Sequence, residues 1–412
     1  MNERVMMIFS LSAVLFIAVQ LISSSNVIDN LTVIANISVN QTYANANANA
    51  TTQEKRKQRI CILAGPHKTG TSSVQTNLYR WSKPTINFTE WSKPTNNFTN
   101  ASKAEPLISW IWPVPLKIAE IEHNDTHTWD WAPSKVFYPM MEVLMDAKQH
   151  PKKRSLFQKY TPREIIDMYH DTIASYWNEG YDIVFGTEAM DLIVKLPEGP
   201  SMIRNLSAHI LPETIDGRQV TVVVMYRTPK IKHLVSMWHQ NCNRPTDDKF
   251  YEWITRTSNT LGPIDALGMV DLLLNETNWN VALINLSGLS EHNWDISNFV
   301  ACKVLGEKCK DKFLKGLHGS EPVITNVRSG QRDPNVPNKT LDEMDIVLKD
   351  FDCNYPHILG EKVGDRLKIY YPGELRTTMR RCEKLGEEGY PQSRDEMRQQ
   401  IKDIALKHGK LW

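Results

Sequence analysis

The segment from residue 61 to residue 73 constrains the fold of this chain more than any other. A short apolar strand at 61–65 is predicted to run into a loop bounded by Gly65 and Gly70. The loop continues into Thr71, Ser72 and Ser73, whose residue types favour the start of a helix. Backbone N–H groups at such a turn converge on one point, and the helix dipole adds positive potential there. The segment therefore predicts an anion site at a strand–helix turn.

The position of Lys68 indicates which anion the loop suits. A P-loop that binds nucleoside triphosphates has its lysine directly after the second glycine. Here Thr71 follows Gly70, and Lys68 precedes that glycine. The ammonium group therefore approaches the anion from a different place. The loop is predicted to hold a phosphate-like group, and its pattern argues against an ATPase or a GTPase.

Strand-like and helix-like segments alternate along the rest of the chain. Strands are predicted at 181–185, Val220–Tyr226 and Asn280–Asn285, and helices at about 162–178, 229–241 and 295–305. The run Val220–Tyr226 is continuously apolar, which is typical of a strand covered on both faces. The alternation predicts an α/β fold, a single P-loop-like domain whose mostly parallel central sheet is flanked by helices.

A second candidate binding element follows the strand Val220–Tyr226. Arg227 stands where that strand ends, Thr228 is a favourable N-cap, and Pro229 suits the first helical position. Ser236 then falls about two turns into the helix. The guanidinium group of Arg227 can bind a phosphate with two parallel hydrogen bonds, and a hydroxyl group adds another donor. This element therefore predicts a second phosphate site.

The sequence Pro-His-Lys-Thr-Gly-Thr-Ser-Ser at 66–73 resembles the 5′-phosphosulfate-binding loop of sulfotransferases that use 3′-phosphoadenosine 5′-phosphosulfate (PAPS). It is most similar to the membrane-bound, carbohydrate-type branch, where a Lys-Thr-Gly core is common. The spacing of Arg227 and Ser236 resembles that family's 3′-phosphate-binding element. The segment 295–306 is a weaker match to a packing helix that begins with an acidic residue. The resemblance covers roughly residues 58–380.

The resemblance implies PAPS as the co-substrate and gives roles to individual residues. Lys68 would neutralise charge on the bridging oxygen of the donor, so that positioning and electrostatics carry most of the catalysis. No cluster of His, Cys and Asp has the spacing of a metal site. The residues expected to bind the donor are His67, Lys68, Thr69, Gly70, Thr71, Ser72, Ser73, Arg227, Ser236 and, in a late basic turn, Arg328.

The catalytic base is predicted to be Glu188. It follows closely after the strand predicted at 181–185, so it would project from the sheet edge where an α/β crevice lies. Desolvation there would raise the pKa of its carboxyl group toward a useful value. A solvated or helix-capping Glu188 is the alternative. Related enzymes use either Glu or His as the base, and His67, His123 and His127 are the histidine candidates.

The N-terminus predicts entry into the secretory pathway. Residues 5–22 are almost wholly apolar and just long enough to span a bilayer. Arg4 precedes them and no Lys or Arg follows before Lys55, which favours a cytosolic tail at 1–4 and a lumenal body. An uncleaved type II signal anchor is the favoured interpretation. A cleaved signal peptide ending near 23–25 is the alternative, and it delivers the domain to the same compartment.

Residues 23–57 form a predicted low-complexity stem, and Asn-x-Ser/Thr glycosylation sequons are dense between Asn30 and Asn124. The sulfotransferase-like domain is expected at 58–385 and a charged C-terminal helix at 386–412. The stretch 81–90 is repeated almost unchanged at 91–100, which is typical of a surface insertion, here predicted at about 81–135.

The chain has six cysteines, and an oxidising compartment allows them to form disulfides. Cys302 and Cys309 are close enough to bridge a short turn, and Cys353 is a candidate partner for Cys382. Cys61 is expected to be a buried thiol. Cys242 has no obvious partner, and spacing alone leaves other connectivities open.

These features predict a Golgi, single-pass type II membrane enzyme that transfers a sulfuryl group from PAPS to a hydroxyl or amine of a glycan or glycoprotein. A tyrosylprotein sulfotransferase is one alternative, although that group generally has Pro-Arg-Ser-Gly-Thr-Thr in this loop. A nucleotide-dependent kinase or NTPase and a non-catalytic glycosylated surface protein are the others. The 48 basic and 47 acidic residues nearly cancel, so nothing in the charge suggests a nucleic-acid partner.

Overall fold

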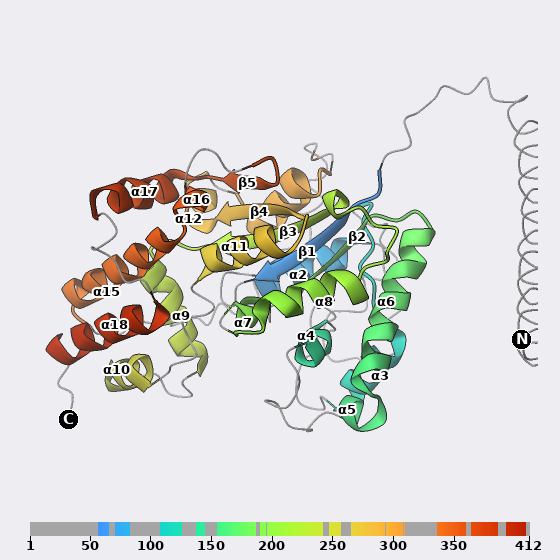
Figure 1. The fold of residues 1–412 in the computed structure, drawn as a ribbon, viewed down its shortest axis with the longest axis horizontal. Coiled ribbons are helices and arrows are strands. Elements are labelled where there is room, and N and C mark those ends of the chain that lie inside the picture. Colours follow the sequence, from blue (N-terminus) through green and yellow to red (C-terminus); the bar gives the residue numbers. More distant parts are fainter. Residues whose placement is uncertain are drawn as a thin grey trace, which may run out of the picture. The chain divides into compact units, whose positions relative to one another are not determined.

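Five parallel strands form the central sheet of the domain, and helices cover both of its faces (Figure 1). The strand order is β2-β1-β3-β4-β5, and every pair of neighbouring strands runs parallel. This confirms the predicted α/β class with a central parallel sheet. In the computed structural model the strands are β1 (Ile60–Gly65), β2 (Ile183–Gly186), β3 (Val220–Tyr226), β4 (Asn280–Asn285) and β5 (Leu367–Tyr370).

The chain divides into the units Met1–Lys57 and Gln58–Trp412, and apart from Lys57 every described residue belongs to the second. The predicted anchor at 5–22 and nearly all of the predicted stem lie outside the described residues. Within the described part, no helix combines the length and the apolar character needed to cross a bilayer. The structure describes residues 57–65, 71–82, 108–125, 137–144, 155–186, 190–194, 196–241, 247–256, 265–292, 294–307, 309, 336–359, 364–385 and 393–408.

The apolar composition of the strands explains their place in the core. All residues of β1 and β2 are buried, as are nearly all residues of β3 and β4. β3 and β4 have the bounds predicted from the sequence, whereas the strand predicted at 181–185 runs from Ile183 to Gly186. The edge strand β5 was not predicted, because its Leu-Lys-Ile-Tyr sequence is short and mixed, and it is only partly buried.

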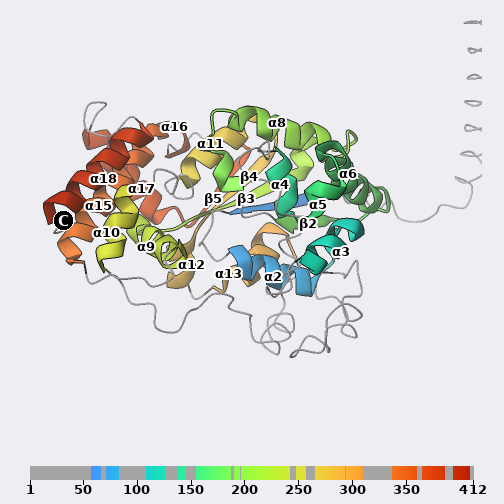
Figure 2. The same cartoon turned by 90° about the horizontal axis from the view of Figure 1, so that it is seen from below.

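Each face of the sheet is covered by its own set of helices (Figure 2). α6 (Pro162–Asn178), α8 (Gly199–His209) and α11 (Ala266–Glu276) lie on one face, with α6 against β2 and α11 against β3 and β4. α2 (Thr71–Trp81) covers β1 and β2 on the other face and packs against α13 (Ile296–Phe299). α6 has the predicted bounds, and the helix predicted at 295–305 is α13 followed by a π-helical turn.

The remaining helical elements connect these layers and extend the carboxyl end of the sheet. They are α3 (Leu116–Asp125), α4 (Tyr138–Leu144), α5 (Ser155–Lys159), α7 (Met190–Ile193), η6 (Gly217–Gln219), α9 (Lys230–Asn241), α10 (Asp247–Arg256), α12 (Leu286–Glu291), η8 (Val300–Val304), α15 (Asn338–Phe351), η9 (Asp352–Asn354), α16 (Pro356–Leu359), α17 (Gly373–Leu385) and α18 (Arg394–His408).

A second apolar core lies among α9, α10, α15 and α18, which Figure 1 shows grouped together. α9 starts just after the carboxyl end of β3, so this group adjoins that end of the sheet. The predicted charged C-terminal helix is α18. Three of its apolar side chains, Met397, Ile401 and Ala405, are buried in the second core, whereas Leu406 is exposed.

Part of the predicted insertion at about 81–135 lies in the core of the domain. Trp110, Ile111 and Trp112 are buried in the main core, and Ile111 forms a parallel bridge with Ile183 of β2. An apolar segment that extends the sheet edge cannot be a solvated surface loop, so 108–112 belongs to the domain core. Apart from its first two residues, the duplicated stretch at 81–100 lies outside the described residues.

Both candidate cysteine pairs form disulfides in the structure. Disulfides join Cys302 to Cys309 and Cys353 to Cys382. Cys61 is a buried free thiol, and burial raises its pKa to about 12. Cys242 lies outside the described residues. The two disulfides fit a secreted or lumenal protein, because such bonds persist in oxidising compartments.

Candidate functional site

The carboxyl ends of β1 and β3 define the centre of the candidate site. These strands are parallel neighbours, and Gly65 at the end of β1 is in register with Val224 near the end of β3. The chain leaves β1 toward β2 on one side and continues through β3, β4 and β5 on the other. In open α/β sheets, ligands bind at such a switch point, outside the carboxyl ends of the strands. The predicted loop and Arg227 both start from this point.

The backbone on both sides of the predicted anion loop has the expected form. β1 ends at Gly65 with φ of 105°, a left-handed conformation that favours glycine, and α2 begins at Thr71. The loop residues His67, Lys68, Thr69 and Gly70 lie outside the described residues. The same holds for the side chains of Thr71, Ser72 and Ser73, so the donor-binding roles of this whole group stay predictions.

Arg227 directly follows β3 and is half-buried at the carboxyl edge of the sheet. Thr228 does not stand at the predicted N-cap position, because the helix starts at Lys230, and the Thr228 hydroxyl group donates to the Ser287 hydroxyl, 3.0 Å away. The N–H group of Ile231, in the first turn of α9, donates to the carboxylate of Asp345 at 2.9 Å. The helix starts at Lys230, one residue later than predicted, and its cap comes from α15.

Ser236 is half-buried on α9, about two turns from its start, as the sequence predicted. Most of its neighbours on this helix, including Leu234 and Trp238, are buried in the second core. Packing of α9 on α10 and α15 therefore fixes the orientation of this helix and the position of Ser236 on it. Arg227 and Ser236 thus belong to one strand–helix unit.

The predicted base, Glu188, and Arg328 lie outside the described residues, as do His127 and the side chain of His123. The strand before Glu188, β2, ends at Gly186 beside β1. A Cβ atom at Gly186 would lie 2.7 Å from the amide nitrogen of Gln75. The nearby edge of the crevice is therefore tightly packed and requires glycine.

Gln75 is a polar residue of this region that sequence reasoning missed. It lies on the sheet-facing side of α2, is 1% exposed, and its amide nitrogen has no hydrogen-bond partner in the described part of the chain. Its position between Val74 and Leu78, on the apolar face of the predicted helix, is the sequence signal that could have shown it to be buried. A buried amide donor without a partner is rare in proteins.

A buried ionic cluster beside Arg227 was also missed. The ammonium group of Lys230 pairs with a carboxylate oxygen of Asp352, and these side chains are 2% and 0% exposed. The Tyr226 hydroxyl donates to the other oxygen of Asp352 at 2.9 Å. Burial raises the pKa of Asp352 to about 6, although Lys230 opposes that change. Burial and the Asp352 carboxylate raise the pKa of Tyr226 well above its usual range.

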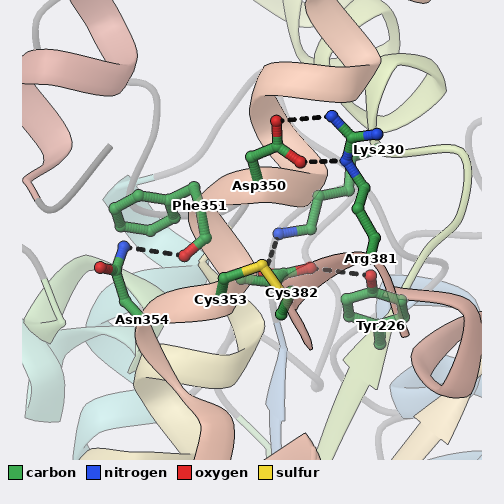
Figure 3. The surroundings of a disulfide bond; sticks show 9 residues. Tyr226, Lys230, Asp350, Phe351, Cys353, Asn354, Arg381 and Cys382 are labelled. Carbon is green, nitrogen blue, oxygen red and sulfur yellow. Dashed lines mark hydrogen bonds and ion pairs between the residues drawn. A yellow bond between two sulfur atoms is a disulfide. The ribbon is translucent and has the colours of Figure 1, made fainter. Parts of the chain in front are cut away.

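The cluster is anchored to α17 by covalent and ionic links (Figure 3). Cys353, the residue after Asp352, forms a disulfide with Cys382 of α17. Arg381 of α17 binds both carboxylate oxygens of Asp350, one of them at 2.8 Å. These links fix η9, and with it Asp352, between α15 and α17.

Comparisons of this chain with protein-family models, with curated proteins and with solved structures each find no match. In the residues that the structure describes, no group of His, Cys, Asp and Glu side chains is arranged to hold a metal ion. The candidate site is therefore supported by its own geometry and not by similarity to a known protein.

Proposed function

We propose that this protein is a PAPS-dependent sulfotransferase of the secretory pathway that transfers a sulfuryl group to a hydroxyl or amine of a glycan. One observation carries the proposal: the anion loop at 66–70 and Arg227 leave adjacent parallel strands at the switch point of the sheet. Neighbouring strands are about 4.8 Å apart, so two anion-binding elements start side by side.

PAPS suits such a pair of elements because it carries anions on both sides of its ribose. In the proposed complex, the 5′-phosphosulfate lies on the loop and at the N-terminus of α2, where the helix dipole favours an anion. The 3′-phosphate is bound by Arg227 and Ser236, one strand away. Nucleoside triphosphates have no 3′-phosphate and leave the second element without a ligand.

In the proposed reaction, the acceptor oxygen or nitrogen attacks the sulfur atom, and the bond from sulfur to the bridging phosphate oxygen breaks. 3′-Phosphoadenosine 5′-phosphate then leaves with the electron pair of that bond. Lys68 stabilises the charge that develops on the bridging oxygen. Glu188 takes the proton of the acceptor.

The proposed setting is the Golgi lumen, with residues 5–22 as a type II anchor. The two disulfides and the sequon-rich stem support a lumenal domain, and glycans are abundant acceptors there.

Nucleotide binding to the full-length chain tests this function. We expect 3′-phosphoadenosine 5′-phosphate to bind more tightly than ATP in isothermal titration calorimetry. Lys68→Ala and Arg227→Ala should each weaken that binding about tenfold or more, because each removes a charged hydrogen-bond donor. Arg218→Ala is the matched control, since this exposed arginine precedes β3 at the end opposite Arg227.

Tighter binding of ATP, or wild-type affinity in both site variants, would overturn the proposal. Transfer of labelled sulfate from PAPS to a glycan array then identifies the acceptor. Glu188→Gln should lower the transfer rate and leave the affinity for 3′-phosphoadenosine 5′-phosphate unchanged.

A further inference from the structure

One carboxylate, that of Asp352, holds both ends of the segment that carries Arg227. The Tyr226 hydroxyl, just before Arg227, donates to Asp352 Oδ2 at 2.9 Å. The ammonium group of Lys230, three residues after Arg227, pairs with Asp352 Oδ1. The last residue of β3 and the first residue of α9 are therefore fastened to the same side chain.

The backbone between these two ends is held from other elements as well. The Thr228 hydroxyl donates to Ser287 of α12, and the Ser287 hydroxyl donates back to the Thr228 carbonyl oxygen. Asp345 of α15 accepts from the Ile231 N–H group at 2.9 Å. The turn that presents Arg227 is thus fixed on both sides, and Asp352 is the contact that spans it.

Asp352 itself has little freedom to move. Its side chain is fully buried, and the next residue is tied to α17 by the Cys353–Cys382 disulfide (Figure 3). Thr378 of α17 forms a hydrogen bond with Tyr226, so α17 supports the same contact from the tyrosine side. A displacement of Asp352 would require movement of several packed elements.

We propose that Asp352 is a positioning residue of the nucleotide site: by holding Tyr226 and Lys230 it sets where Arg227 stands at the carboxyl edge of the sheet. Asp352 does not touch the nucleotide, because its carboxylate is buried behind the turn. This inference rests on the proposed function, since the ligand of Arg227 is taken to be the 3′-phosphate. Asp352 is expected to affect the binding of the 3′-phosphate and of no other part of the ligand.

The test separates the 3′-phosphate from the rest of the ligand. Dissociation constants of the full-length chain are measured for 3′-phosphoadenosine 5′-phosphate and for adenosine 5′-phosphate, which lacks the 3′-phosphate. In Asp352→Asn we expect the first ligand to bind about tenfold more weakly and the second to bind as in the wild type. The preference for the 3′-phosphorylated ligand therefore falls.

Asp265→Asn is the matched control. Asp265 is also a fully buried carboxylate that binds a cation, Arg394, and a tyrosine hydroxyl, that of Tyr355. It contacts the starts of α11 and α18 and not the turn at Arg227. Its substitution should leave the preference for the 3′-phosphorylated ligand at the wild-type value even where stability falls.

Two further variants keep the proposal testable if Asp352→Asn folds poorly. Tyr226→Phe removes a single hydroxyl group and should lower the preference in the same direction by a smaller factor. In the Arg227→Ala background, Asp352→Asn should have no further effect on the preference, because the group it positions is gone.

The proposal is overturned if Tyr226→Phe and Asp352→Asn keep the wild-type preference, or if Asp352→Asn weakens both ligands equally. Equal binding of both ligands by the wild type, without any preference, would instead refute the proposed function together with this inference. A wild-type preference that Arg227→Ala abolishes and Asp352→Asn leaves intact refutes only the inference.

Discussion

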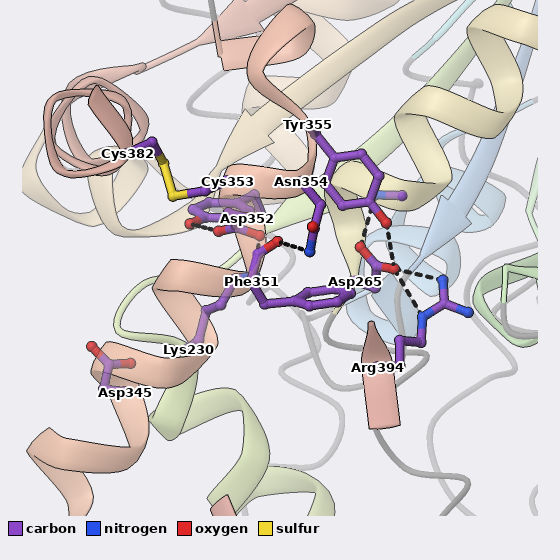
Figure 4. Close-up of polar contacts among 12 residues, drawn as sticks. Lys230, Asp265, Asp345, Phe351, Asp352, Cys353, Asn354, Tyr355, Cys382 and Arg394 are labelled. Carbon is purple, nitrogen blue, oxygen red and sulfur yellow. Dashed lines mark hydrogen bonds and ion pairs between the residues drawn. A yellow bond between two sulfur atoms is a disulfide. The ribbon is translucent and has the colours of Figure 1, made fainter. Parts of the chain in front are cut away.

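Asp352 and Asp265 are both fully buried carboxylates, and each binds one cationic side chain and one tyrosine hydroxyl. Figure 4 shows the contacts of Asp265 with Arg394 and Tyr355. Asp265 accepts from the Gly268 N–H group at 2.8 Å as the N-cap of α11, and from two nitrogens of Arg394 at the start of α18. Asp352 accepts from Lys230 and Tyr226. Asp265 therefore joins two helix ends, whereas Asp352 spans a strand–helix turn.

The two clusters differ in how well the charge is satisfied. Asp265 has a helix N-terminus and a guanidinium fork, which are strong and directional donors. Arg394 is 26% exposed, so its own charge stays partly hydrated. Lys230 is almost fully buried, and the elevated pKa of Asp352, about 6, shows the cost of holding this pair away from water. Asp265 therefore caps one helix and binds the start of another, whereas Asp352 lies beside a candidate ligand site.

The largest expected difference is the effect of deleting each carboxylate on stability. Asp352→Ala leaves the Lys230 ammonium group buried without a counter-charge, and should lower the free energy of unfolding by about 3–5 kcal/mol. Asp265→Ala should cost less, about 2–3 kcal/mol, because Arg394 can turn to water and still donate to the Val194 carbonyl oxygen. Urea unfolding of the full-length chain measures both. A greater loss in Asp265→Ala would contradict this account of the two clusters.

The disulfide next to Asp352 provides a second difference, because the Asp265 cluster has no covalent link. Replacing Cys353 and Cys382 by Ser opens a loop of sequence separation 29 and should cost roughly 3–4 kcal/mol. The control, the same replacement of Cys302 and Cys309 with separation 7, should cost roughly 2–3 kcal/mol. In addition, only the first pair should weaken binding of 3′-phosphoadenosine 5′-phosphate. Equal binding by the two double variants would show that the link does not reach Arg227.

A pH titration should change the stability through Asp352 by up to about 3 kcal/mol, since its pKa is raised from 3.8 to about 6. The folded state then binds the proton more tightly than the unfolded state. Its contribution to stability is fully present below pH 3.8 and is lost as the pH rises through about 6. Asp352→Asn should lack this fall, while Asp265→Asn should retain most of it, because the Asp265 charge is only a minor cause of the raised pKa of Asp352.

Unfolding free energies of the three proteins between pH 4 and pH 7 check this expectation. An identical slope in Asp352→Asn and the wild type would refute it. The titratable groups that face Asp352 are the same in the wild type and in Asp352→Asn. Their own titration therefore cancels when the pH profile of one protein is subtracted from that of the other. They are Lys230, Tyr226, Asp265 and Asp345, with the Asp350–Arg381 pair nearby on α15 and α17.

The sequence was informative where structure depends on neighbours in the chain. β3 and β4 could be predicted because their apolar runs are continuous, and α6 also has the predicted bounds. The separation of 7 between Cys302 and Cys309 pointed to one disulfide, whereas Cys353 and Cys382, 29 residues apart, were a candidate pair that spacing alone did not decide. The strand order, and with it the switch point between β1 and β3, was not predicted, because it depends on which strands pair.

The sequence was not informative where contacts join distant residues. The cap of α9 is Asp345, 114 residues from Ile231, and a local rule assigned that role to Thr228. Lys230 and Asp352 are 122 residues apart, and no periodic pattern links them. The segment 108–112 lies in the main core, although its place after a duplicated stretch suggested a surface loop. Such contacts are determined by packing, which a single sequence does not reveal.

The smallest expected effects come from the two tyrosine hydroxyls, and they compare the clusters with least disturbance. Tyr226→Phe and Tyr355→Phe each remove one hydrogen bond of 2.9 Å to a buried carboxylate and leave the ring in place. Tyr226→Phe should lower the free energy of unfolding by about 1.5–2 kcal/mol, because Lys230 is then the one partner of the Asp352 carboxylate among the described residues. Tyr355→Phe should cost about 1 kcal/mol or less, because Asp265 still accepts from Gly268 and Arg394. Thermal unfolding at pH 7 resolves this difference, and a larger loss in Tyr355→Phe would mean that the number of remaining donors does not determine the cost.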